Sequence, residues 1–173
     1  YNILSQNRTT DIVFQWDKTL SLDGNSAPYI QYTAARANSI LKKAQTEKRN
    51  DRKKSENQFT LFEAIATSEQ SEDALPSPDS DPSGKKPCEL ILASQLMKFS
   101  ESVARAASEY RPNIITNYLY ETSKLFNTFY HELPVLQAES ETARNFRLAL
   151  TQATKVVLRE GLELIGIEVP DEM

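Results

Sequence analysis

The chain has 173 residues, which is enough for one domain with a hydrophobic core, or for one domain with a tail. Hydrophobic residues make up 39% and charged residues 25%, as in soluble globular proteins, and the net charge is −4. Only 4 residues are glycine, which disfavours a turn-dense β-sandwich and a glycine-rich nucleotide fold. The single cysteine excludes an internal disulfide bond and indicates a reducing compartment, and the single histidine excludes any site that needs two. No apolar run approaches the ~18 residues of a membrane-spanning helix.

Residues 1–24 are predicted to be the end of a preceding structural unit. The stretch from Asp11 to Trp16 has a short extended pattern, and Asp23-Gly24 is typical of a turn. The large apolar residues of this region either pack on the helices that follow or belong with a preceding domain. Because the chain starts at Tyr1 rather than at a methionine, we interpret it as a processed chain or as a piece of a longer one.

The first long helix is predicted to begin near Asn25 or Ser26, both good N-cap residues, and to reach about Lys48. Pro28 is tolerated in its first turn. Apolar residues recur at the spacing of a buried helical face, namely Ile30, Ala34, Ala37, Leu41 and Ala44.

Residues 49–86 differ in composition from the rest and are predicted to be an insertion. They open on a run of charge from Arg49 to Lys54, and a short amphipathic helix is expected around Phe59, Phe62 and Ile65. Residues 67–88 are rich in serine, proline and acidic side chains, which is linker composition. We therefore expect the insertion to be loosely attached.

The remainder is predicted to be almost continuous helix, over residues 88–98 and 100–109, from Pro112 to Pro134, and onward from Ser140. Gly166 followed by Ile167 fits a left-handed C-cap. The fold class is accordingly all-α, a bundle of about five helices with one long insertion. The apolar residues expected to face the core from the last helix are Phe146, Ala149, Leu150, Ala153, Val156, Val157, Leu164 and Ile165.

Catalytic and metal-binding patterns are missing from the sequence. His131-Glu132 is followed by Leu133-Pro134 instead of a second histidine, and Cys88 has no second thiol or histidine nearby. Ser83-Gly84-Lys85 resembles the end of a phosphate-binding loop, but Asp79 stands where the first glycine belongs. We therefore expect no catalytic residue, metal or cofactor within these 173 residues.

A second stripe, of aromatic and basic residues, runs along the helix over residues 28–48. If Tyr29 is set at 0° and each residue adds about 100°, Tyr32 falls near 300° and Arg36 near 340°. Lys43 falls near 320°, whereas the apolar stripe centres at about 100°. Rings stack on unpaired RNA bases, at roughly 1–3 kcal/mol each, while cations bind phosphates. The pattern also fits a solvated helix with tyrosines half-buried at its edges.

Basic residues are concentrated around this stripe. Between residues 29 and 54 there are eight basic residues and two acidic ones, so the local charge is +6 in a chain of charge −4. Tyr118 and Tyr120, on the helix after Pro112, fit either base stacking or core packing. The final Met173 could fray, or its thioether could pack against a base.

Three groups of residues, taken in chain order, carry a resemblance to a known family. The first is Ala27-Pro28-Tyr29-Ile30-Gln31-Tyr32 with Arg36 and Ser39-Ile40-Leu41. The middle group is Arg111-Pro112, Asn117-Tyr118-Leu119-Tyr120-Glu121, Phe126-Asn127 and Phe129-Tyr130. The last is Arg147-Leu148-Ala149-Leu150, Gly161-Leu162, Leu164-Ile165-Gly166-Ile167 and Pro170-Asp171-Glu172-Met173. Over residues 1–48 and 87–173 the chain resembles the DALR-type anticodon-binding domain of arginyl-tRNA synthetases, with Arg8 to Asp17 similar to the segment that leaves their catalytic domain.

The resemblance implies a helical bundle over residues 25–173 that binds the tRNA anticodon stem-loop, after an exit segment over residues 1–24. It implies that the full protein is an ATP-dependent arginine–tRNA ligase that works in translation. ATP and Mg²⁺ would bind an upstream catalytic domain, whose His-Gly and Lys-Ser motifs are missing here, so the fragment alone is expected to be inactive. The expected partner is arginine tRNA, and no contact with DNA or a membrane is expected. The protein is expected to be a monomer in the cytoplasm, although an organelle is left open.

The resemblance places Tyr32 and Arg36 on the helix that faces the anticodon, and Met173 at a terminus near the anticodon loop. Gln31 is a candidate for reading base edges, because stacking alone tolerates any base. The candidate RNA-binding residues are Tyr29, Gln31, Tyr32, Arg36, Lys43, Tyr118 and Met173.

The insertion over about residues 49–86 departs from the family pattern. Its acidic side chains would repel RNA, so we expect it to point away from the tRNA. A function of another class is open as well, namely a helical protein-interaction module whose partner binds the insertion. An unrelated enzyme is disfavoured, because the sequence has no paired histidine, cysteine or buried acid candidates.

Overall fold

The computed structural model describes residues 1–7, 9, 11, 15–52, 87–171 and 173. Every regular element within these ranges is a helix, which confirms the predicted all-α fold class. Two single-turn helices come first, α1 (Asn2–Ser5) and α2 (Trp16–Thr19). Five of the described helices have ten or more residues, namely α3 (Ala27–Arg52), α5 (Cys88–Met97), α6 (Phe99–Glu109), α7 (Asn113–Glu132) and α8 (Glu141–Leu164).

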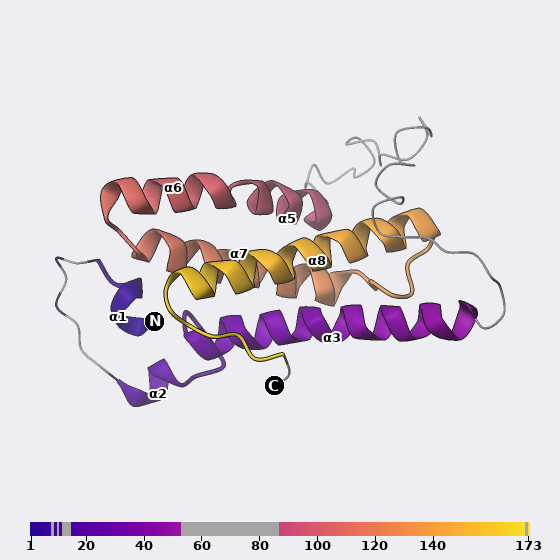
Figure 1. The fold of residues 1–173 in the computed structure, drawn as a ribbon, viewed down its shortest axis with the longest axis horizontal. Helices are drawn as coiled ribbons and strands as arrows, with labels where there is room; N and C mark the ends of the chain where they lie inside the picture. The colour runs from indigo at the N-terminus through magenta and orange to yellow at the C-terminus, as the bar shows by residue number, and fades with distance from the viewer. Residues whose placement is uncertain (8, 10, 12–14, 53–86, 172) are drawn as a thin grey trace.

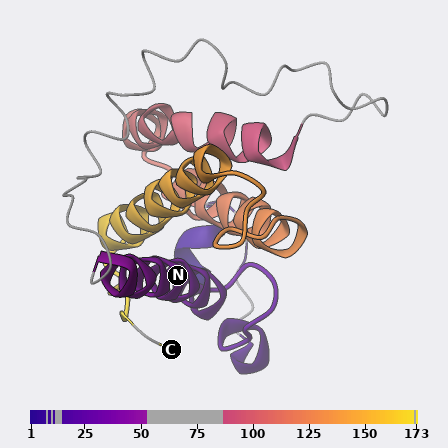
Figure 2. The ribbon, with the colours of Figure 1, turned by 90° about the vertical axis from the view of Figure 1, so that its right-hand side faces the viewer.

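The long helices are arranged in three layers (Figure 1). α7 and α8 pack against each other in the middle layer, with α3 on one side of them and α5 and α6 on the other. Figure 2, seen from the end of the bundle, shows the same order of layers. Since α3 contacts both α7 and α8, two of its sides meet different neighbours.

Local signals in the sequence explain where the helices start and stop. The Ser26 hydroxyl accepts a hydrogen bond from the Tyr29 amide (3.3 Å), and Ser140 caps α8 by accepting from the Ala143 amide (3.1 Å). At the end of α8, Gly166 has a φ of 78°, the left-handed region that glycine adopts without strain. The Gly166 and Ile167 amides donate to carbonyls of the last turn at 2.9 Å, which completes the predicted C-cap.

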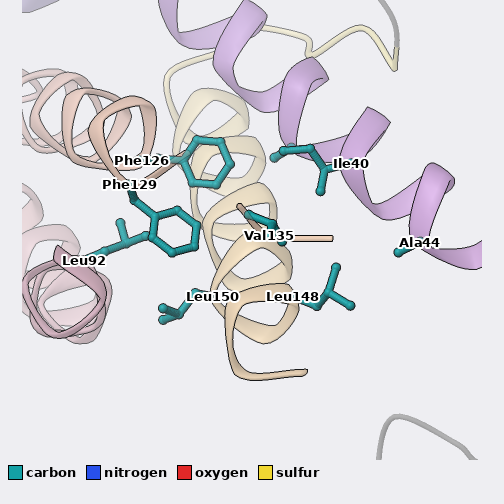
Figure 3. Packing of buried hydrophobic residues seen from close by; sticks show 9 residues of the cluster. Ile40, Ala44, Leu92, Phe126, Phe129, Val135, Leu148 and Leu150 are labelled. Atoms are coloured by element: carbon teal, nitrogen blue, oxygen red, sulfur yellow. The ribbon is translucent and has the colours of Figure 1, made fainter. Parts of the chain in front are cut away.

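Two clusters of buried apolar side chains hold the layers together. Figure 3 shows the first, in which Phe126 and Phe129 of α7 fill the space between α3, α5 and α8. Their ring centroids are 6.0 Å apart. The second cluster joins α3, α6, α7 and α8 and includes Ile30, Tyr118, Leu119, Leu158 and Leu162.

A buried arginine fixes the end of the bundle where α8 begins. The Arg147 side chain is 6% exposed and forms an ion pair with Glu89 of α5 at 2.7 Å. It also donates to the Pro134 carbonyl at 3.0 Å and lies 3.3 Å from the Glu139 carboxylate. This one guanidinium therefore ties together α5, α8 and the loop between α7 and α8.

The buried face of α8 differs from the predicted one. Phe146, Val156 and Leu164 are 38%, 45% and 56% exposed, and Ala153 is exposed too, so these four assignments to the core were wrong. Threonines occupy core positions in their place, because their hydroxyls bond to carbonyls one turn earlier in the same helix. The buried residues of α8 are Arg147, Leu148, Leu150, Thr151, Thr154, Leu158, Gly161 and Leu162.

Two predicted boundaries also change. α3 continues to Arg52, four residues past the predicted end, so the first residues assigned to the insertion are helical. Trp16, predicted to be extended, begins α2, and its side chain is 68% exposed. The expected amphipathic helix around Phe59 and the linker composition of residues 67–86 lie outside the described residues.

The described residues include neither a membrane-spanning helix nor a cluster of metal-ligating side chains. No described helix is long and apolar enough to cross a bilayer. No three histidine, cysteine, aspartate or glutamate side chains gather there in a way that could hold a metal ion. Burial, and then the nearby Glu132 carboxylate, raise the pKa of the Cys88 thiol, so at neutral pH it is in its protonated, weakly nucleophilic form.

Candidate nucleic-acid interface

The centre of the candidate interface is an arginine held between two aromatic rings on adjacent helices. The guanidinium carbon of Arg36, on α3, lies 4.7 Å from the Tyr32 ring centroid and 5.6 Å from that of Tyr130 on α7. The two tyrosines are 37% and 42% exposed. A half-buried arginine packed on exposed aromatic rings in this way provides a charge and two ring surfaces at one place.

The Asn127 side chain holds this group in place through hydrogen bonds to α3. Its amide oxygen accepts from Nη1 of Arg36 at 2.9 Å. Its amide nitrogen donates to the Tyr29 hydroxyl at 3.0 Å and to the Thr33 hydroxyl at 3.2 Å. Because one amide bonds to three side chains of α3, the register between α3 and α7 and the direction of Arg36 are set together.

A shallow, open depression of about 430 Å³ lies beside Asn127. The Lys124 ammonium stands at its edge, 5.4 Å from the Tyr120 ring centroid and 3.2 Å from the Glu121 carboxylate. The Tyr120 ring in turn packs on Tyr29, with centroids 5.7 Å apart. The lining residues are Tyr29, Lys124, Asn127, Thr128, His131 and Glu132.

The structure brings together only part of the predicted set. Tyr29, Tyr32 and Arg36 lie on the face of α3 beside α7, and Lys43 is exposed two turns after Arg36. Tyr29 is half-buried, and its hydroxyl is already bonded to Asn127, so its ring has less surface for stacking than that of Tyr32.

Gln31 lies on a different face of α3, and Met173 lies on the C-terminal segment that contacts this face. The Gln31 side-chain amide donates to the Glu168 carbonyl at 2.7 Å, which ties the C-terminal segment to α3. As long as this bond is made, the amide nitrogen of Gln31 is engaged with the protein. Met173 is 60% exposed, and its thioether is accessible at the chain's end.

Tyr118 is misplaced in the predicted set. It is only 7% exposed, and its hydroxyl donates to the Gln95 carbonyl at 2.8 Å. Its ring packs against Phe99, with centroids 5.8 Å apart. Burial raises the pKa of the phenol above its usual value. The ring is thus a core group that joins α7 to the α5–α6 layer, and it has no face to offer an RNA base.

Sequence reasoning missed three contributors from α7, namely Lys124, Asn127 and Tyr130. A signal exists for Lys124 and Asn127, because Tyr120, Lys124, Asn127 and His131 recur at three- and four-residue spacing and so share one polar face of α7. That face lies beside the aromatic and basic stripe of α3 only once the two helices are packed together. Pairing the two stripes needs the tertiary structure.

Comparison with known proteins assigns the chain to one family. The model of the family described as the DALR anticodon binding domain matches residues 30–173. The chain belongs to this family. Its matched region includes the whole of α5 to α8 and most of α3, and with them the Arg36 group.

The relatives and solved structures agree with that assignment. The chain is 39% identical over 173 residues to a protein of Fusobacterium nucleatum and 37% identical to one of Edwardsiella ictaluri, both named arginine–tRNA ligase. The chain spans about a quarter of their length, 26% and 25% respectively. It also superposes on Thermus thermophilus arginyl-tRNA synthetase with a TM-score of 0.74 and 30% identity, covering 99% of this chain and 25% of that one.

Proposed function

We propose that this domain binds the anticodon stem-loop of an arginine tRNA, as part of a longer arginine–tRNA ligase. The observation that carries the proposal is the half-buried Arg36 side chain held between the exposed rings of Tyr32 and Tyr130. Membership of the anticodon-binding family and the names of the relatives support it.

Each member of the group has a distinct task in this proposal. Loop bases that leave the anticodon stack extend the ring–guanidinium stack, on the outer faces of Tyr32 and Tyr130. A guanidinium has five N–H donors. Of the Arg36 nitrogens, only Nη1 has a hydrogen-bond partner among the described residues, the Asn127 amide oxygen. The remaining donors suit phosphate oxygens, which accept from arginine in a bidentate fashion.

In this proposal, two lysines on either side of Arg36 contact further phosphates of the RNA backbone. Lys43 lies two turns further along α3, and its exposed ammonium suits the stem phosphates. Lys124 lies on α7 beside the depression, where its contact with Glu121 is solvent-exposed and readily exchanged for a phosphate. Three such contacts give a slope of log affinity against log salt of about −2, at roughly −0.7 for each contact with single-stranded RNA.

The activity of the whole protein belongs to the same proposal. In it, arginine is joined to its tRNA with ATP, and this domain orients the tRNA toward a distant active site. In this proposal, ATP and Mg²⁺ bind in another domain of the longer protein. We propose a monomer that acts in the cytoplasm.

A fluorescence-anisotropy titration tests the proposal. The chain is titrated into a labelled arginine anticodon stem-loop and into the same stem-loop with altered anticodon bases, each at two salt concentrations. We expect micromolar affinity, at least fivefold preference for the arginine loop, and a salt slope of about −2 for three contacts. Equal binding of both loops would contradict base readout, and affinity no higher than for a non-RNA polyanion would favour a protein-interaction module.

A further inference from the structure

The C-terminal segment after α8 crosses over α3 and ends on its far side (Figure 1). Every second side chain of this segment packs on the protein: Ile165, Ile167 and Val169 are half-buried against the cluster that contains Ile30 and Ala34. The turn at Gly166 sends the chain back along α3.

Two side-chain amides of α3 grip the backbone of this segment. The Gln31 amide donates to the Glu168 carbonyl at 2.7 Å, and the Asn38 amide donates to the Asp171 carbonyl at 2.8 Å. Asn38 is 7% exposed, and its own oxygen accepts from the Lys155 ammonium of α8 at 2.9 Å. The bond from a charged donor fixes which way the Asn38 amide points, so that its nitrogen faces the segment.

The two amides that hold the C-terminal segment lie on a different face of α3 from the Arg36 group. Gln31 and Asn38 are seven residues apart, hence on one face of the helix, and Ala35 between them is 4% exposed. On a helical wheel the next face around α3 is that of Tyr32, about 120° from Asn38. Only Glu172 separates Asp171 from Met173 in the chain, and the Met173 side chain is 60% exposed.

We propose that Asn38, oriented by Lys155, is a positioning residue that clamps the C-terminal segment to α3 and so sets where the last residues, Met173 included, stand beside the anticodon-binding face. This inference rests on the proposed function. Asn38 itself touches no RNA in this account and acts only through the Asp171 carbonyl. A buried asparagine with both ends of its amide bonded is a specific feature, since most other side chains of similar size lack either the donor or the acceptor.

A double-mutant cycle tests the clamp. The variants are Asn38→Ala, removal of residues 171–173, and the combination of the two, each in the 173-residue chain. Stem-loop affinity is measured by anisotropy, and hydrogen exchange reports the amides of residues 167–171. The control is Thr46→Ala, on the same helix, because the Thr46 hydroxyl bonds only within α3, to the Lys42 carbonyl.

We expect Asn38→Ala to speed exchange of the segment at least tenfold and to weaken stem-loop binding about fivefold. In the shortened chain the same substitution is expected to change affinity less than 1.5-fold, whereas Thr46→Ala changes neither quantity. Unchanged exchange would overturn the clamp. Faster exchange with unchanged affinity, or an equal loss of affinity in both backgrounds, would overturn the positioning role.

Two features keep the result interpretable. Gln31→Ala loosens the same segment from its other contact, so it replaces Asn38→Ala if circular dichroism shows that the latter is unfolded. If the unsubstituted chain does not prefer the arginine stem-loop, the proposed function fails, and the exchange data still decide whether Asn38 holds the segment.

Discussion

The guanidinium carbon of Arg36 lies 4.7 Å from the centroid of the Tyr32 ring, one helical turn away on α3. The contact with Tyr130 from α7 and the bond to Asn127 hold the same arginine from two other sides. Because these contacts exist without RNA, little side-chain entropy remains to be lost on binding. The stack is thus preorganised by the packing of α3 on α7.

Removing the arginine is expected to weaken RNA binding without unfolding the domain. Arg36→Ala should weaken stem-loop affinity about tenfold, which is about 1.4 kcal/mol. The affinity of Arg36→Lys should lie between those of the unsubstituted chain and Arg36→Ala, because lysine retains the charge but lacks the planar group that stacks. Anisotropy titrations measure both effects. Arg105→Ala is the matched control, since Arg105 lies on α6 in an exposed pair with Glu109, and a similar loss there would show that charge alone matters.

Tyr118 should show the opposite pattern, with an effect on stability and none on RNA binding. Its hydroxyl bond to the Gln95 carbonyl is worth about 1 kcal/mol, and Tyr118→Phe should lose that amount. Urea denaturation measures the loss, and titration should find stem-loop affinity unchanged within twofold. A tenfold loss of affinity in the folded variant would restore Tyr118 to the binding face.

The phenols also predict how stability depends on pH. Burial raises the pKa of Tyr118 and of Tyr1 in the folded chain above the unfolded value near 10. Above pH 10 the unfolded chain loses these protons first, so stability is level below that pH and falls as pH rises beyond it, by up to about 1.4 kcal/mol per unit for each group. Urea midpoints at pH 8, 10 and 11 measure this fall. Tyr118→Phe should reduce the fall, and an unchanged slope would show that Tyr118 titrates normally.

The buried arginine of α8 should be among the most sensitive positions in the fold. Arg147→Ala leaves the largely buried Glu89 carboxylate without its partner, which typically costs about 3–5 kcal/mol. Arg147→Met combined with Glu89→Gln should cost less than Arg147→Ala alone, because no unpaired charge remains. Denaturant midpoints decide between them. If the double variant is the less stable one, the ion pair itself is the source of stability.

A matched pair of backbone substitutions tests the helix ends. Tyr110 ends α6 with a φ of 54°, a left-handed conformation that strains a side chain, whereas Gly166 ends α8 with a φ of 78°. Tyr110→Gly should stabilise the domain by about 0.5–1 kcal/mol, and Gly166→Ala should destabilise it by about 1 kcal/mol. Thermal unfolding measures both. Destabilisation by Tyr110→Gly would indicate that the exposed ring makes contacts worth more than the strain.

Much of the helical architecture follows from local signals in the sequence. The N-cap serines, the prolines that separate helices and the glycine at the end of α8 act within a few residues, so they could be recognised without tertiary structure. The face of α8 could not, because Thr151 and Thr154 are buried after satisfying their hydroxyls inside the helix, while Phe146 and Val156 remain exposed.

The candidate interface shows the same division. Tyr32 and Arg36 are found by helical periodicity, since both belong to α3. Asn127 and Tyr130 come from a helix some 90 residues later in the chain, and the sequence does not indicate how α7 is rotated against α3. The depth of a ring in the core, which removes Tyr118 from the interface, is likewise a tertiary property.

Chemical-shift mapping with the arginine anticodon stem-loop tests the central claim most directly, because it locates the bound RNA on the 173-residue chain without any substitution. We predict that the largest amide and side-chain shifts fall on the face of α3 and α7 that carries Tyr32, Arg36, Asn127 and Tyr130. Shifts concentrated on the α5–α6 layer instead, with the Arg36 group unchanged at saturation, would contradict the account.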